Sequence, residues 1–133
     1  MSVIKTTYIG DLQTKIEHVQ SGSYVTTDAD ARKVKNSFSS NELFVGTVAA
    51  CILTVMEATA QQYHFSIGRA EALASRTMRN NPKTIDKIEI NIYIDNSGLS
   101  QEQKDILAHA AYNCPVVLSL HDAIEKIFVF HYR

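Results

Sequence analysis

The chain has 133 residues, of which 45% are hydrophobic and 20% are charged, a composition typical of one globular domain spanning 1–133. Thirteen basic residues against fourteen acidic ones give a net charge of −1, which excludes the basic excess that nucleic-acid binders use. The first ten residues carry no signal pattern. The longest uncharged apolar-rich stretch, 43–56, is shorter than the roughly 20 residues of a membrane span. We therefore expect a cytoplasmic protein that contacts neither nucleic acid nor membrane.

The first quarter of the chain is predicted to form strands. Residues 3–9 are rich in β-branched side chains, and Gly10-Asp11 after them is a hairpin signal. Apolar and polar residues then alternate over 12–19, and a short third strand is expected at 24–27. Together these segments predict a three-stranded antiparallel meander. The polar segment 28–37 has no periodicity and is expected to be a surface loop.

A long helix is predicted from Glu42 to about Tyr63, with N-cap candidates at 39–41. Its apolar residues cover most of the circumference, which is typical of a buried helix. Thr47, Thr54 and Gln61 recur every seven residues and form one polar stripe, on which Cys51 also lies.

The remaining elements predict an α+β fold in the order β-β-β-α-β-β-α-(α)-β. Strands are expected at 68–78, 88–94 and 126–132. Ser100 and Gln103 form a capping box that opens a second helix, and Pro115 can begin a further short helix. The long apolar helix is hard to bury within one small domain, so a partner subunit is expected to cover it.

Cys51 and Cys114 are the main candidates for chemistry, although free cysteines usually act as small buried hydrophobes. Cys114 precedes Pro115 at a helix start, where the helix dipole favours the thiolate. The histidines are scattered without metal-ligand spacing, so no metal site is expected, and the absence of phosphate-binding loops predicts no cofactor. His121 is a possible neighbour of Cys114, but a surface or capping role is its simpler interpretation.

The order of three motifs resembles the OsmC/Ohr family of osmotically induced and organic hydroperoxide resistance proteins. Ser40-Asn41-Glu42-Leu43 through Ala49-Ala50-Cys51 lies on the long helix, and Asn113-Cys114-Pro115-Val116 follows about sixty residues later. Between them lies the Ile-Asp-Lys-Ile-Glu-Ile strand, and Tyr8-Ile9-Gly10-Asp11-Leu12 is similar to a small-protein branch of the family.

This resemblance implies an intertwined α+β homodimer with antiparallel sheets packed around two central helices. It also implies a thiol peroxidase in which Cys51 attacks an organic hydroperoxide, Cys114 resolves the sulfenic acid, and a dithiol restores both thiols. The alternative is a non-peroxidase dimer that binds a small apolar molecule and whose cysteines are vestigial. A purely structural core without redox chemistry is the third possibility.

Two departures from the family pattern concern the group that activates Cys51. Family members place an arginine after Gly-Asp-Leu, where this chain has Gln13. The acid that orients this arginine is displaced by one position, with Glu42 standing in for it. Arg32 is the nearby substitute for the missing positive charge, although a solvated loop charge is its simpler interpretation. Without such a charge, less thiolate is expected at neutral pH.

Overall fold

The computed structural model describes residues 2–32 and 35–133, and it confirms the predicted α+β order of elements. The chain divides into two compact units, Met1–Phe44 and Val45–Arg133, which are described separately. The expectation of a single domain stays a prediction. The elements are β1 (Ile4–Gly10), β2 (Gln13–His18), β3 (Tyr24–Thr27), α1 (Ser40–Gln62), β4 (Ala70–Arg79), β5 (Thr84–Ile94), α2 (Gln101–Tyr112), α3 (Pro115–Leu118) and β6 (Glu125–Tyr132).

The first unit contains the predicted antiparallel meander, in the order β1-β2-β3. The turn between β1 and β2 has the two residues expected, but they are Asp11 and Leu12 instead of Gly10 and Asp11. Both adopt positive φ, as does Gly10 at the end of β1. Ser37 and Asn36 follow β3 in the loop that leads to α1, and Phe38 forms a bridge to Thr27. Many large apolar side chains of this unit are exposed, which means that little of its surface is covered within one chain. They include Val3, Ile4, Tyr8, Ile9, Leu12, Val19 and Tyr24.

Helix α1 begins with a capping box, because Ser39 and Glu42 bond each other reciprocally. The Ser39 hydroxyl accepts from the Glu42 N–H at 3.2 Å, and the Glu42 carboxylate accepts from the Ser39 N–H at 2.8 Å. This arrangement selects Ser39 among the three predicted N-cap candidates. The helix therefore starts two residues earlier than expected.

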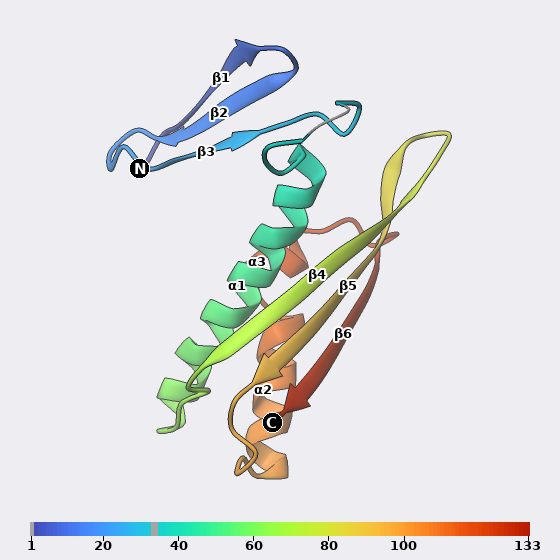
Figure 1. Ribbon diagram of the computed structural model, residues 1–133. Helices are drawn as coiled ribbons and strands as arrows, with labels where there is room; N and C mark the ends of the chain where they lie inside the picture. Colours follow the sequence, from blue (N-terminus) through green and yellow to red (C-terminus); the bar gives the residue numbers. More distant parts are fainter. Residues whose placement is uncertain (1, 33–34) are drawn as a thin grey trace. The chain divides into compact units, whose positions relative to one another are not determined.

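The second unit packs helices against one face of a sheet in the order β4-β5-β6 (Figure 1). β4 and β5 are antiparallel, whereas β6 returns parallel to β5 after the crossover through α2 and α3. The predicted alternation in β5 is confirmed, since its even-numbered isoleucines from Ile88 to Ile94 are buried. The predicted capping box of Ser100 and Gln103 is also confirmed at the start of α2.

The core of the second unit joins α1 to the sheet and to α2. It contains Val48, Ile52 and Met56 from α1, together with Leu107 from α2. α1 is nevertheless only partly covered: it is long and apolar enough to cross a membrane by length and composition, and 33% of its most apolar window is buried. A membrane span and the core helix of a folded domain pass this test equally, and the contacts with the sheet and α2 are those of a core helix.

Candidate active site

The structure brings the two predicted thiols together within the second unit. Cys51 lies in the middle of α1 and is half-buried, while Cys114 is the fully buried N-cap residue of α3. Both are free thiols, and hydrogen bonding between the Cys51 sulfur and Cys114 contributes to the pKa of Cys114. Residues that are 63 positions apart in sequence thus form one pair with one partly accessible sulfur.

The expectation that the helix start favours a Cys114 thiolate is wrong. Burial raises the pKa of Cys114, and the backbone N–H groups of Val117 and Val116, which lower it, do not compensate. The neighbouring Cys51 raises it further by hydrogen bonding and charge. Four-residue α3 has little helix dipole with which to oppose this desolvation. Cys114 is therefore protonated at neutral pH.

The predicted polar stripe on α1 lies on the exposed side of the helix. Thr47, Thr54 and Gln61 are all exposed, and the Thr54 hydroxyl donates to the Ala50 carbonyl at 2.9 Å. Because Cys51 lies between the first two, its accessible side belongs to this stripe. Within one chain, Cys51 is thus the accessible member of the pair.

In the first unit, Gln13 and Arg32 meet on a common acceptor, the buried carboxylate of Asp28. Gln13 Nε2 donates to Asp28 Oδ1 at 2.7 Å, and the Arg32 guanidinium donates to the same oxygen. The second oxygen accepts the N–H groups of Asn36 at 2.6 Å and Ser37 at 3.0 Å. Burial by itself raises the pKa of Asp28, but these hydrogen bonds outweigh it and lower the pKa to about 2.

Two interpretations of this segment are wrong. Arg32 is not a solvated loop charge: its side chain is 19% exposed and it bonds both Asp28 and Asp11. The loop is not uniformly on the surface, since Asp28 is 2% exposed. Sequence reasoning missed Asp28 because an aspartate directly after a strand is usual in a turn. No local sequence pattern marks Asp28, because its contacts with Gln13 and Arg32 are seen only in the folded chain.

Glu42 is occupied by local contacts. Besides capping α1 through Ser39, its carboxylate forms an ion pair with Lys35. The hydrogen bond from Lys35, followed by that from the Ser39 backbone, lowers the pKa of Glu42 to about 2. The structure therefore gives Glu42 a role in starting the helix, and places Arg32 on Asp28 instead.

His121 has the local capping contact that was its simpler interpretation. Its Nδ1 accepts the Ala123 N–H at 2.9 Å, and the side chain is exposed. Among residues 2–32 and 35–133, no group of three or more metal-ligating side chains is placed to hold an ion.

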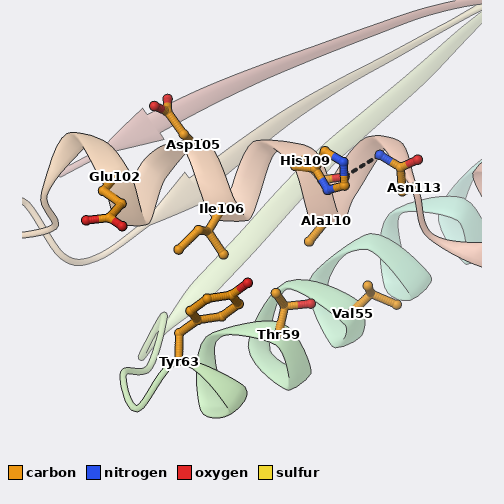
Figure 2. A pocket seen from close by; sticks show the side chains of 9 residues that line it. All are labelled: Val55, Thr59, Tyr63, Glu102, Asp105, Ile106, His109, Ala110 and Asn113. Carbon is orange, nitrogen blue, oxygen red and sulfur yellow. Dashed lines mark hydrogen bonds between the residues drawn. The ribbon is translucent and has the colours of Figure 1, made fainter.

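A groove of about 490 Å³ lies between α1 and α2 in the second unit. Figure 2 shows Val55, Thr59 and Tyr63 of α1 facing Ile106 and Ala110 of α2. Glu102 lies at the Tyr63 end and Asn113 at the Val55 end. Val55 follows Cys51 by one helical turn and Asn113 directly precedes Cys114, so this second end adjoins the thiol pair.

An α+β fold with a cysteine on the central helix and a second one before a proline defines a class of thiol-containing proteins. The family model for OsmC-like protein matches residues 14–126 of this chain. The chain therefore belongs to the OsmC-like family.

Solved structures of this family are similar over nearly the whole chain. A Psychrobacter arcticus protein named for osmotic stress induction and a detoxification response is 29% identical, with a TM-score of 0.90 over 98% of this chain and 96% of that one. An organic hydroperoxide resistance protein OsmC from Legionella pneumophila is 15% identical, with a TM-score of 0.76 over 98% and 96%. OhrB of Bacillus subtilis, an organic hydroperoxide resistance protein, is 16% identical, with a TM-score of 0.70 over 98% and 97%. A search of the curated proteins finds no match.

Proposed function

We propose that this protein is a cytoplasmic, homodimeric thiol peroxidase that reduces organic hydroperoxides with Cys51 and Cys114. The observation that carries the proposal is the pairing of a partly accessible Cys51 with a buried, protonated Cys114. In this arrangement a peroxide can reach the Cys51 sulfur, and the Cys114 sulfur lies beside it. Membership of a family with peroxide-resistance proteins among its structures supports the same reaction class.

The reaction proceeds in three balanced steps. The Cys51 thiolate attacks the terminal oxygen of the hydroperoxide, the O–O bond breaks, and the alkoxide takes a proton and leaves as an alcohol. The product is a sulfenic acid at Cys51. The Cys114 sulfur then attacks the Cys51 sulfur, forming a disulfide and releasing water. A dithiol reduces this disulfide by exchange, becoming a disulfide itself and restoring both thiols.

We further propose that the reactivity of Cys51 depends on Arg32. Gln13 occupies the position at which the family resemblance implies an arginine, and it shares Asp28 with Arg32. Through Asp28, this cluster holds the Arg32 guanidinium near Gln13, at the position where the family resemblance implies an arginine. Glu42, which is committed to Lys35 and Ser39, has no part in holding that guanidinium.

The homodimer is supported by surface that one chain leaves uncovered. Only six of the 23 residues of α1 are buried. The first unit exposes a run of large apolar side chains. Burying apolar area is favourable by about 25 cal/mol per Å², so a second copy that covers these surfaces gains substantially.

The alternative is a dimer that binds a small apolar molecule and whose cysteines take no part in redox chemistry. Gln13 favours it, because an amide cannot supply the charge that lowers a thiol pKa. The two functions differ in whether cumene hydroperoxide consumes the free thiols.

The test is to mix the reduced protein with cumene hydroperoxide and count free thiols. Wild type should lose two thiols per chain and form an intramolecular disulfide, and Cys114→Ser should stop at a Cys51 sulfenic acid that dimedone traps. Cys51→Ser should consume no peroxide. Arg32→Ala should slow the reaction at least tenfold, whereas Lys83→Ala, an exposed cation of the second unit, should not. Unchanged thiols in the wild type would favour the non-redox alternative.

A further inference from the structure

Two donors from different parts of the first unit converge on the carboxylate of Asp28. Asp28 directly follows β3 and is 2% exposed, and its Oδ1 accepts from Gln13 Nε2 at 2.7 Å and from the Arg32 guanidinium. Gln13 begins β2, whereas Arg32 lies in the loop after β3. Two donors that share one acceptor lie within about 6 Å of each other. Positions 13 and 32 therefore present their side chains to the same point.

Arg32 supplies the positive charge at this point, and Asp28 fixes its place. Gln13 is neutral, and the second oxygen of Asp28 is occupied by two backbone N–H groups. The other partner of Arg32 is Asp11, whose side chain is 79% exposed, so solvent screens that ion pair. A buried carboxylate that loses its only partner charge is left uncompensated, which is costly. The Asp28 carboxylate thus calls for one guanidinium beside it.

The shared oxygen does not require that this guanidinium come from position 32. Arginine is longer than glutamine and carries five donors in a planar fork, so an arginine at position 13 can reach the oxygen that Gln13 reaches. Glutamine at position 32 would leave that place to it. With arginine at both positions, by contrast, two cations would compete for one carboxylate.

We propose that Asp28 is a positioning residue of the peroxidase site and that it holds one guanidinium, taken from either position 13 or position 32. Arg32 and Gln13 are then exchangeable: one supplies the charge, and the other is its neutral neighbour on the same oxygen. This inference rests on the proposed function for the effect of the guanidinium on Cys51. The exchange itself can be followed through stability, which needs no turnover.

The test exchanges the two side chains. Arg32→Gln removes the guanidinium, and Gln13→Arg combined with Arg32→Gln returns it from β2 with the composition of the wild type. Arg79→Gln, at the exposed end of β4, is the matched control for the loss of an arginine. Three properties are compared: the midpoint of urea denaturation, the pH profile of Cys51 alkylation, and the rate of cumene hydroperoxide reduction.

Arg32→Gln should lower the urea midpoint, move the alkylation profile to higher pH by about one unit, and slow peroxide reduction about tenfold. The exchange variant should regain most of all three properties. Asp28→Asn, which keeps Arg32 and the size of the side chain, should also move the alkylation profile, and adding Gln13→Arg should not move it back. A merely structural role would change the urea midpoint and leave this profile in place. Arg79→Gln should behave as the wild type does.

Three results would overturn the inference: an exchange variant whose alkylation profile stays with that of Arg32→Gln, a folded Asp28→Asn variant with the wild-type profile, or the same displacement of the profile in Arg79→Gln. Reduction of cumene hydroperoxide by the wild type tests the proposed function separately. If the wild type reduces the peroxide and the exchange variant does not recover, only the role of Asp28 falls. If the wild type does not reduce it, the peroxidase function is wrong, and recovery of the urea midpoint in the exchange variant would still show that Asp28 accepts a guanidinium from either position.

Discussion

Cys51 and Cys114 differ in accessibility, and Cys51 contributes to the pKa of Cys114. Burial raises the pKa of Cys114, and hydrogen bonding and charge at Cys51 add to the effect. In the proposed reaction Cys51 becomes a neutral sulfenic acid, so the contribution of charge at Cys51 to the pKa of Cys114 ends. We therefore expect Cys114 to ionise more readily at the step in which it attacks the Cys51 sulfur.

This coupling predicts that Cys51→Ala lowers the pKa of Cys114 while burial keeps it above the ordinary value. The pH profile of Cys114 alkylation, followed by mass spectrometry of its peptide, should move to lower pH in that variant. Thr54→Ala, three residues from Cys51 on the exposed stripe, should leave the profile in place. A profile that stays put or moves upward in Cys51→Ala would contradict the coupling.

Asp28 makes the stability of the first unit depend on pH in the acidic range. Its folded pKa is about 2, below the ordinary 3.8, so its contribution is present above about pH 4 and is lost as the pH falls toward 2. Asp28→Asn should be less stable at neutral pH, and its denaturation midpoint should fall less steeply over that window. The pKa values of Asp30 and Glu42 are also lowered to about 2, so these two groups should retain part of the dependence of stability on pH in the variant.

The matched control for this experiment is Asp86→Asn, an exposed aspartate of β5. It should reproduce the wild-type acid profile. If Asp28→Asn shows the full wild-type slope, the buried carboxylate does not hold the loop as described.

The elements themselves were predictable to different degrees. β5 and the start of α2 followed from alternation and from a single capping box, both of which are local signals. The start of α1 did not, because Ser39, Ser40 and Asn41 are equally good caps by type, and the choice depends on which serine faces Glu42. The parallel return of β6 and the Asp28 cluster depend on contacts between distant segments, which periodicity cannot reveal.

At the start of α1, Ser39→Ala should lower the free energy of unfolding by about 1 kcal/mol, since it removes one side of the capping box. Ser40→Ala, at the neighbouring exposed position, is the matched control and should change stability little. Chemical denaturation of both variants measures the difference. Equal stabilities would show that Ser39 is not the cap that matters.

For the whole molecule, the exposed side of α1 predicts the effect of a new charge. Ala58 is exposed on this helix, and Ala58→Glu should weaken the proposed homodimer by placing an unpaired charge in its interface. Sedimentation at micromolar concentration should show a dimer for the wild type and a shift toward monomer for the variant. Ala123→Glu, on an exposed turn, should sediment as the wild type does. A folded wild-type monomer would disprove the assembly.

The crossover between β5 and β6 carries Cys114, and this has a consequence for how the chain folds. Cys51 and Cys114 lie together only when α2 and α3 pack against α1, so their proximity is a long-range contact of the folded chain. In an unfolded chain the two thiols are separated by a long flexible loop, so an oxidant should join them less readily than in the folded protein. The same argument applies to gentle denaturation: the ability to form the intramolecular disulfide should disappear while helical content persists. The yield of the intramolecular disulfide thus measures how far α2 and α3 have packed against α1.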